Sequence, residues 1–222
     1  MKDKLKKFIK KYYKAIIVFA CLLITIDMVF IIFSKEVMKI DVIGYNLVSK
    51  YLISDTTFPI VKLITNIGGV LGVIVIATII SIILIIKKQK LIALLTWINL
   101  GCSALLNQIL KRIIQRPRPT GYRLIEEDGY SFPSGHSMVS AAFYGLFIYL
   151  IFKNVKNKYL KWGSISFLSI LICLIGISRI YLGVHYTSDV MTGFVISIAY
   201  LIIFTSIVNK YLDKSKKEID KK

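Results

Sequence analysis

Apolar residues are gathered into long runs, and short polar stretches separate one run from the next. A helix needs about 20 apolar residues to cross the hydrocarbon of a bilayer. Six runs reach or approach this length, and they cover residues 15–33, 60–86, 91–110, 138–152, 163–177 and 190–208. The sequence therefore predicts an all-α integral membrane protein, folded as one bundle of six transmembrane helices.

The 222 residues leave room for one such bundle and its connections. We expect a single membrane domain over residues 15–208, between a basic N-terminal segment at 1–14 and a basic tail at 209–222. The N-terminal segment carries seven lysines and one aspartate. No small-residue cleavage site follows Phe33, so we interpret the first run as an uncleaved span rather than a signal peptide.

The formal net charge of +18 comes mostly from basic residues clustered between the apolar runs. They do not form the basic stripe, interleaved with aromatic residues, that is typical of nucleic-acid binding. Their placement fits the lysine- and arginine-rich cytoplasmic loops of membrane proteins and attraction to anionic lipids. We therefore assign both termini and the connections at 87–90 and 153–161 to the cytoplasm. The expected location is the cell membrane, with no nucleic-acid partner.

In this topology residues 34–58, 111–137 and 178–189 lie on the outer side. Within the first of these segments, a near-helical spacing of apolar residues predicts a short amphipathic helix on the membrane surface. These residues are Ile40, Ile43, Leu47, Tyr51 and Leu52. Asp27 lies inside the first apolar run, where an ionisable group is costly, and we expect it to make a structural polar contact in the bundle.

The outer segment 111–137 departs from the charge rule because it holds five lysine and arginine residues. The chain has only two histidines, His136 and His185, and both fall in outer segments near arginines. A basic outer face that gathers both histidines indicates that these charges serve chemistry.

The first of three motifs occupies residues 111–119. The planar guanidinium of Arg118 suits two phosphate oxygens, and Lys111 supplies a compact point charge. Prolines on both sides of Arg118 stiffen the backbone that presents it. Arg112 and Arg116 have two open interpretations, because they can anchor the third span at the headgroups or belong to the site.

The second motif is Pro-Ser-Gly-His at residues 133–136, directly before the fourth span. The first backbone N–H groups of a helix have no partner within the helix and lie at the positive end of its dipole, so they attract anions. Gly135 lets the main chain approach an oxygen closely. Ser134 either adds to this site or serves only as the helix cap, and His136 can protonate a leaving oxygen.

The third motif occupies residues 178–189. His185 and Asp189 are four residues apart and share a helix face if the sixth span begins nearby. Asp189 can then accept a hydrogen bond from one ring nitrogen of His185 and leave the other free as a nucleophile. Arg179 adds a further donor for a phosphate group.

The motifs together supply three cationic side chains for a phosphate, Lys111, Arg118 and Arg179, and no cluster of carboxylates at metal-ligand spacing. Phosphoryl transfer depends mainly on positioning and on neutralising charge, so these cations can do the work that magnesium does elsewhere. The consecutive acidic residues at 126–128 point in different directions, and we interpret them as a solvated loop. We therefore expect neither a metal ion nor a cofactor.

These residues resemble the three signature motifs of the type 2 phosphatidic acid phosphatase / vanadium haloperoxidase superfamily. The signatures are Lys-x6-Arg-Pro, Pro-Ser-Gly-His and Ser-Arg-x5-His-x3-Asp, and every defined position is matched. The resemblance covers residues 60–205 and implies the membrane branch of the superfamily. It implies that His185 forms a phosphohistidine, that Asp189 orients His185, and that His136 is the general acid. The phosphate would be held by Lys111, Arg118, Ser134, Gly135 and Arg179.

Residues 122–138 also resemble bacterial phosphatidylglycerophosphate phosphatases of the B type. The expected function is metal-independent hydrolysis of phosphatidylglycerophosphate or phosphatidate at an active site on the outer membrane face. An undecaprenyl pyrophosphate phosphatase is the close alternative, although such enzymes of this superfamily often carry aspartate in place of Gly135. A non-enzymatic lipid-phosphate binder and a transporter are distant alternatives. The intact His136, His185 and Asp189 weigh against the first, and the lack of an internal repeat weighs against the second.

Overall fold

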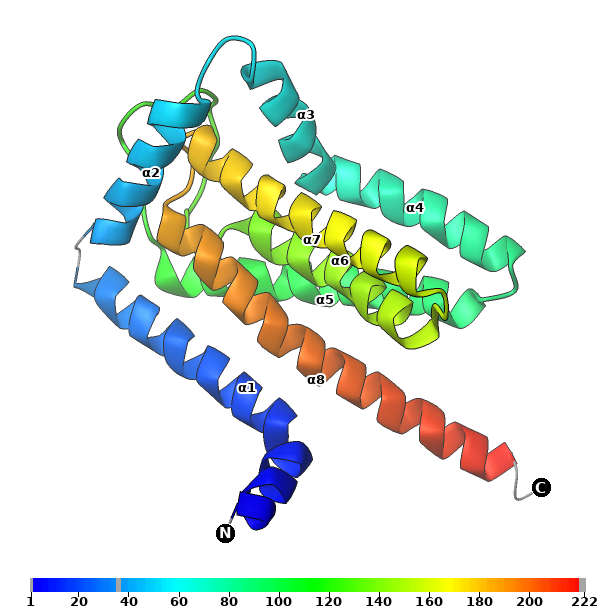
Figure 1. The fold of residues 1–222 in the computed structure, drawn as a ribbon. Helices are drawn as coiled ribbons and strands as arrows, with labels where there is room; N and C mark the ends of the chain where they lie inside the picture. The colour runs from blue at the N-terminus through cyan, green and yellow to red at the C-terminus, as the bar shows by residue number, and fades with distance from the viewer. Residues whose placement is uncertain (1, 35–36, 220–222) are drawn as a thin grey trace.

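The computed structural model describes the backbone of residues 2–34 and 37–219, and the side chains of residues 11–34 and 37–211. All regular elements in these ranges are helices, which confirms the predicted all-α fold. In chain order they are α1 (Lys2–Phe33), α2 (Lys39–Leu52), α3 (Phe58–Gly68), α4 (Val70–Ile86), α5 (Lys90–Ile114), α6 (Gly135–Asn154), α7 (Lys158–Tyr181) and α8 (Thr187–Ile219) (Figure 1).

Five helices are long and apolar enough to cross a membrane, counted over the described residues. Helices α3 and α4 pass the same test together, are bent by 59° at the break between them, and give a sixth candidate span when the pair is taken as one. The six-span prediction is therefore confirmed, with the second span bent rather than straight. Glycine makes the bend possible, because a β-carbon on Gly72 would collide with the carbonyl group of Asn66.

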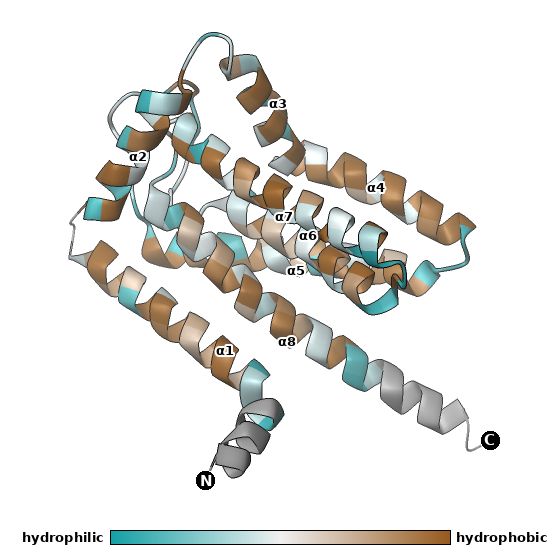
Figure 2. Cartoon of the chain, viewed as in Figure 1, coloured by the Kyte–Doolittle hydropathy of each residue, from teal (hydrophilic) through white to brown (hydrophobic). Residues whose placement is uncertain are grey.

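Helix α6 packs against α5, α7 and α8, and α4 packs on α5. Helix α1 packs mainly along α8. Figure 1 shows that α1 begins and α8 ends at the end of the bundle away from α2. Figure 2 shows that the coloured part of α1 and helix α4 consist largely of apolar residues, and many of their large apolar side chains are exposed. Such a surface suits contact with lipid rather than water.

The predicted amphipathic helix is present as α2. Its buried residues are Asp41 and Val48, and the helix packs on α7 and α8. The contact is close, because a β-carbon on Gly44 would collide with the side chain of Thr187 at the start of α8. All five apolar residues of the predicted stripe are exposed, so that stripe faces away from the bundle.

The polar contact expected for Asp27 is not made. The side chain is exposed on α1 and has no hydrogen bond or ion pair with any described residue. The reason is the position of α1, which packs mainly along one helix and leaves much of its surface outside the bundle.

The predicted basic segments at 1–14 and 209–222 continue α1 and α8 as helix, from Lys2 and as far as Ile219. Most of their basic side chains belong to residues 1–10 and 212–222 and lie outside the described residues.

Candidate active site

The three motifs meet at the end of the bundle that carries α2. The first lies at the end of α5 and in the connection that follows, the second at the start of α6, and the third in the last turn of α7 and the first turn of α8. Nη1 of Arg118 lies 3.2 Å from Nε2 of His185. The backbone N–H of Ser134 donates to the carbonyl oxygen of Asp189 at 3.2 Å. Each motif therefore contacts another, although they are far apart in the sequence.

His185 lies in the connection between α7 and α8, two residues before α8 begins. Its side chain is fully buried, and Nδ1 lies 3.5 Å from Oδ2 of Asp189. That separation is longer than a hydrogen bond, and Nδ1 has no hydrogen-bond partner among the described residues. The same carboxylate oxygen accepts the backbone N–H of Tyr186 at 2.9 Å, which ties Asp189 to the residue that follows His185.

The protonation state of His185 follows from its surroundings. Burial, together with the charges of Arg179 and Arg118, lowers the pKa of His185 to about 3 despite the opposing effect of Asp189. The ring is therefore neutral near pH 7. A guanidinium group only donates hydrogen bonds, so Nε2 beside Arg118 must be the accepting nitrogen. The proton then sits on Nδ1 and faces Asp189, and the electron pair of the unprotonated Nε2 accepts from Arg118 until a phosphate oxygen takes that N–H.

Arg118 is buried and held by backbone carbonyl groups. Its Nη1 donates to Val184 at 3.0 Å, and its Nε and Nη2 donate to Gly129 and Asp128 at 3.1 and 2.8 Å. These bonds join the α5–α6 connection to the α7–α8 connection. The guanidinium is thereby fixed beside His185.

Arg179 lies in the last turn of α7 and is 2% exposed. Its Nη1 donates to Oγ1 of Thr65, on α3, at 2.7 Å. Its Nε is buried and has no hydrogen-bond partner among the described residues. Lys111, at the end of α5, donates to the carbonyl oxygen of Tyr130 at 2.8 Å and experiences the charges of Arg118 and Arg179. The three predicted cations are therefore gathered in one region.

Glu127 corrects the prediction of a fully solvated acidic loop. Its neighbours Glu126 and Asp128 are exposed, but the Glu127 carboxylate forms ion pairs with both Arg118 and Arg179. The sequence has no signal that separates it from its neighbours, because the loop conformation selects which carboxylate turns inward. No group of three or more possible metal ligands of the His, Cys, Asp or Glu type occurs in the described part of the chain.

The second motif forms the start of α6. Oγ of Ser134 accepts hydrogen bonds from the backbone N–H and the hydroxyl of Ser137 at 3.4 and 2.9 Å, so this serine caps the helix. Asn107 donates to the carbonyl oxygen of Pro133 at 3.2 Å and holds the motif against α5. A β-carbon on Gly135 would lie 3.1 Å from Oδ1 of Asn107, so the motif packs closely here.

His136 is partly buried and experiences the charges of Lys111 and Arg118. Its Nε2 would lie 3.4 Å from a β-carbon built on Gly69, so the ring lies against the break between α3 and α4. A cavity of about 400 Å³ adjoins both His136 and Lys111. Its remaining walls come mainly from apolar residues of α4 and α5.

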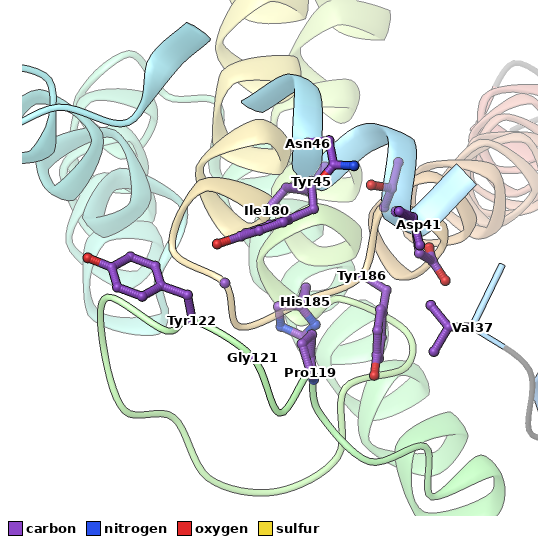
Figure 3. A pocket seen from close by; sticks show the side chains of 13 residues that line it. Val37, Asp41, Tyr45, Asn46, Pro119, Gly121, Tyr122, Ile180, His185 and Tyr186 are labelled. Atoms are coloured by element: carbon purple, nitrogen blue, oxygen red, sulfur yellow. The ribbon is translucent and has the colours of Figure 1, made fainter. Parts of the chain in front are cut away.

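A second cavity of about 200 Å³ lies between α2 and the two connections that carry Arg118 and His185. Figure 3 shows His185 and Tyr186 beneath α2, with Asp41 projecting from α2 towards Tyr186 and Tyr122 on the opposite side of the cavity. Helix α2 therefore covers the connection that carries His185, a role that its sequence did not predict.

The two interpretations left open for Arg112 and Arg116 have different outcomes for the two residues. Arg112 is exposed, which fits an anchor at the membrane surface, whereas Arg116 is 6% exposed and forms ion pairs with Asp41 and Asp189. The spacing of the first motif gives no signal for these pairs, because Asp41 and Asp189 come from distant parts of the chain.

Comparison with known proteins agrees with these motifs. A profile of the PAP2 superfamily matches residues 89–213. The chain is 41% identical to phosphatidylglycerophosphatase B of Bacillus subtilis over 113 residues, which are 50% of this chain and 54% of that protein. It is 37% identical to sphingosine-1-phosphate phosphatase 1 of Rattus norvegicus over 111 residues, 47% of this chain and 25% of that protein. The chain thus matches about half, or less, of the length of these curated relatives.

The fold resembles the crystal structure of a transmembrane PAP2-type phosphatidylglycerolphosphate phosphatase from Bacillus subtilis. The TM-score is 0.74 at 25% sequence identity, over 90% of this chain and 97% of that chain. The superfamily profile covers more than half of this sequence and includes all three motifs. The chain belongs to the PAP2 superfamily.

Proposed function

We propose that this protein hydrolyses a phosphomonoester lipid without a metal ion, by transferring the phosphoryl group first to His185 and then to water. The observation that carries the proposal is the state of His185. Its side chain is buried, burial lowers its pKa to about 3, and Nε2 lies 3.2 Å from the Arg118 guanidinium. An unprotonated ring nitrogen beside phosphate-binding cations is suited to nucleophilic attack.

In the first step, Nε2 of His185 attacks phosphorus and the bond from phosphorus to the lipid oxygen breaks. His136, in its protonated form, gives its proton to the departing lipid alcohol. The His185 ring gains positive charge as the new bond forms, and the negative charge of Asp189 stabilises it.

In the second step, His136 takes a proton from water while the water oxygen attacks phosphorus. The bond between phosphorus and Nε2 breaks, and its electron pair returns to His185. Orthophosphate leaves, and both histidines recover their starting protonation states.

The phosphate is held by Lys111, Arg118 and Arg179, with Ser134 and Gly135 at the N-terminus of α6. The buried Nε of Arg179, which lacks a partner among the described residues, supports this assignment, since a phosphate oxygen can satisfy it. Glu127 occupies two of the same guanidinium groups, so the arriving phosphate displaces its carboxylate.

The lipid character of the substrate is supported by the cavity beside His136. It is lined by apolar side chains of α4 and α5 and adjoins Lys111, so it can take the apolar part of a lipid whose phosphate lies at the cations. The substrates we favour are phosphatidylglycerophosphate and phosphatidate, because the two relatives described above are named for phosphomonoesters of lipids. A further matched relative, dolichyldiphosphatase 1 of Dictyostelium discoideum, is named for a diphosphate and supports the alternative.

An undecaprenyl pyrophosphate phosphatase is the alternative, since a pyrophosphate also presents a terminal phosphate to the cations. The packing of Gly135 against Asn107 favours the monoester. An aspartate at this position, as such enzymes often carry, would require Asn107 to move.

We place the protein in the cell membrane with both termini in the cytoplasm and the site on the outer face. The connections at 87–90 and 153–161 are rich in lysine, as expected for cytoplasmic loops. The arrangement supports one common side for the termini, because α1 begins and α8 ends away from α2 and the motif loops (Figure 1).

The function is tested by phosphate release from purified protein in detergent, with phosphatidylglycerophosphate, phosphatidate and undecaprenyl pyrophosphate as substrates. We expect turnover of a monoester that persists in EDTA and is inhibited by vanadate. His185→Ala lowers kcat at least about 10³-fold, because the nucleophile is lost.

Arg112→Ala serves as the matched control and keeps wild-type turnover, because its side chain is exposed. Wild-type turnover in His185→Ala would disprove the mechanism. Tight binding of lipid phosphate with no turnover in the wild type would favour a lipid-phosphate binder instead.

A further inference from the structure

The carboxylate of Asp189 has two oxygens with different partners. Oδ2 faces Nδ1 of His185 and accepts the backbone N–H of Tyr186. Oδ1 accepts a hydrogen bond from Nη1 of Arg116 at 2.6 Å. Arg116 therefore fixes one oxygen of Asp189 and leaves the other directed at the nucleophile.

Arg116 is itself held from three sides. Its Nη2 donates to Oδ2 of Asp41 at 2.9 Å, and its Nη1 also donates to Oγ of Ser188 at 2.8 Å. Its guanidinium carbon lies 3.9 Å from the ring centroid of Tyr186. A planar guanidinium with bonded donors on two edges and an aromatic ring on its face has little freedom to rotate.

Asp41 connects this group to the start of α8. Its Oδ1 accepts the backbone N–H of Ser188 at 2.8 Å, in the first turn of that helix. The first N–H groups of a helix need partners from outside the helix, and a carboxylate there is favourable. Asp41 therefore caps α8 from another helix while it neutralises Arg116. It lies outside the superfamily profile, which begins at residue 89.

The buried group formed by Asp41, Arg116 and Asp189 carries a net charge beside His185. Asp41 and Asp189 share the single positive charge of Arg116, and all three side chains are at most 6% exposed. The group carries one net negative charge next to a neutral His185. A preorganised negative charge of this kind stabilises the positive charge that the imidazole gains as Nε2 attacks phosphorus.

We propose that Arg116 and Asp41 are positioning residues that set the orientation and charge of the Asp189 carboxylate, so that α2 completes the catalytic machinery. Neither side chain is assigned a contact with the phosphate. The proposal rests on the phosphohistidine chemistry proposed above, and its test separates the two.

The test measures kcat and KM for lipid phosphate hydrolysis, the vanadate inhibition constant and the Tm of Arg116→Gln and Asp41→Asn. Misplacement of an orienting group costs on the order of 10²-fold in rate, so we expect Arg116→Gln to lower kcat by about that factor. For Asp41→Asn we expect about tenfold, because Arg116 keeps its bond to Asp189. KM should change by less than about threefold, since the groups that bind phosphate are intact, whereas vanadate inhibition should weaken together with kcat, because vanadate mimics the five-coordinate transition state.

Four further variants separate positioning from folding. Arg116→Lys keeps the charge and should recover about tenfold of the lost kcat. The double variant Asp41→Asn/Arg116→Gln should be no worse than Arg116→Gln alone, because both changes remove one function. Exposed Arg112 and Asp55 provide the matched controls Arg112→Gln and Asp55→Asn, which should keep wild-type kcat. If Arg116→Gln does not fold, Asp41→Asn and Arg116→Lys carry the test.

Wild-type kcat in Arg116→Gln or Asp41→Asn, with His185→Ala inactive, would overturn this inference and leave the proposed function intact. Additive losses in the double variant, or a loss confined to KM, would also overturn it. An inactive wild-type protein would instead refute the proposed function.

Discussion

The two halves of the chain contribute to the candidate site in different ways. The C-terminal half, α5 to α8, carries all three motifs and nearly all of the superfamily match. The N-terminal half, α1 to α4, carries none of them. Yet Asp41 of α2 bonds Arg116, Thr65 of α3 bonds Arg179, and Gly69 lies against His136. We conclude that the C-terminal half supplies the groups proposed to touch the phosphate, and the N-terminal half holds them in place.

This difference predicts that the largest loss of kcat follows the removal of a phosphate-binding cation of the C-terminal half. Removal of one preorganised donor to the transition state costs about 10²–10³-fold in rate, and we expect this loss in kcat for Arg179→Ala. The rate of phosphate release in detergent, sampled at fixed times, measures this loss of kcat. A loss of less than tenfold would show that Arg179 is not a phosphate ligand.

Glu127 provides a second test of this comparison. It lies in the C-terminal half, and its carboxylate would compete with the phosphate for two of the proposed phosphate-binding cations. Its carboxylate occupies Arg118 and Arg179, so Glu127→Gln should free both guanidinium groups. We expect vanadate to inhibit this variant at about tenfold lower concentration, since charge-assisted pairs to the competing carboxylate are lost. Glu126→Gln, at an exposed neighbour, should leave inhibition unchanged. Weaker vanadate inhibition of Glu127→Gln would mean that Glu127 assists binding.

A support residue of the N-terminal half should matter less. Thr65→Val removes the hydroxyl that accepts from Arg179 at 2.7 Å and preserves the side-chain shape. One such hydrogen bond contributes about 1 kcal/mol, which corresponds to a loss of about fivefold in kcat/KM. Equal losses of kcat/KM for Thr65→Val and Arg179→Ala, measured in the same assay, would contradict the distinction between residues that contact the phosphate and residues that support them.

The last expected effect concerns stability rather than catalysis. The pKa of His185 falls from 6.5 to about 3 on folding, chiefly through burial, so the unfolded chain binds more protons between these values. Stability is therefore retained above pH 6.5 and lost as the pH falls towards 3. From pH 7 to pH 5 this residue lowers the free energy of unfolding by about 2 kcal/mol.

Thermal unfolding in detergent at the two pH values tests this linkage. His185→Gln should show a smaller drop in Tm than the wild type. An equal drop in both proteins would mean that His185 is not the titrating group.

The features that could be predicted from the sequence are those encoded locally. Each span must carry its own apolar run, so the hydropathy pattern identified the six spans, and the third ends at Ile114 rather than at residue 110. The motifs likewise singled out His136, His185 and Asp189, which lie within the match to the superfamily, and their catalytic roles stay a prediction.

The features that could not be predicted depend on tertiary contacts. Arg116 was left open, because its partners Asp41 and Asp189 are 75 and 73 residues away. Glu127 is chemically equivalent to its neighbours in the sequence, and only the loop conformation turns it inward. The polar contact predicted for Asp27 was wrong for a related reason, since a hydropathy pattern does not reveal which face of α1 packs on α8.

The central claim is that His185 carries the phosphoryl group during turnover. The most direct measurement is peptide mapping by mass spectrometry after the protein reacts with lipid phosphate and is quenched in alkali, where phosphohistidine survives. We predict one added phosphoryl group on the peptide that contains His185, with none in His185→Ala. A phosphoryl group on another residue, or an active enzyme that forms no phosphopeptide even when His136→Ala slows its hydrolysis, would contradict the account.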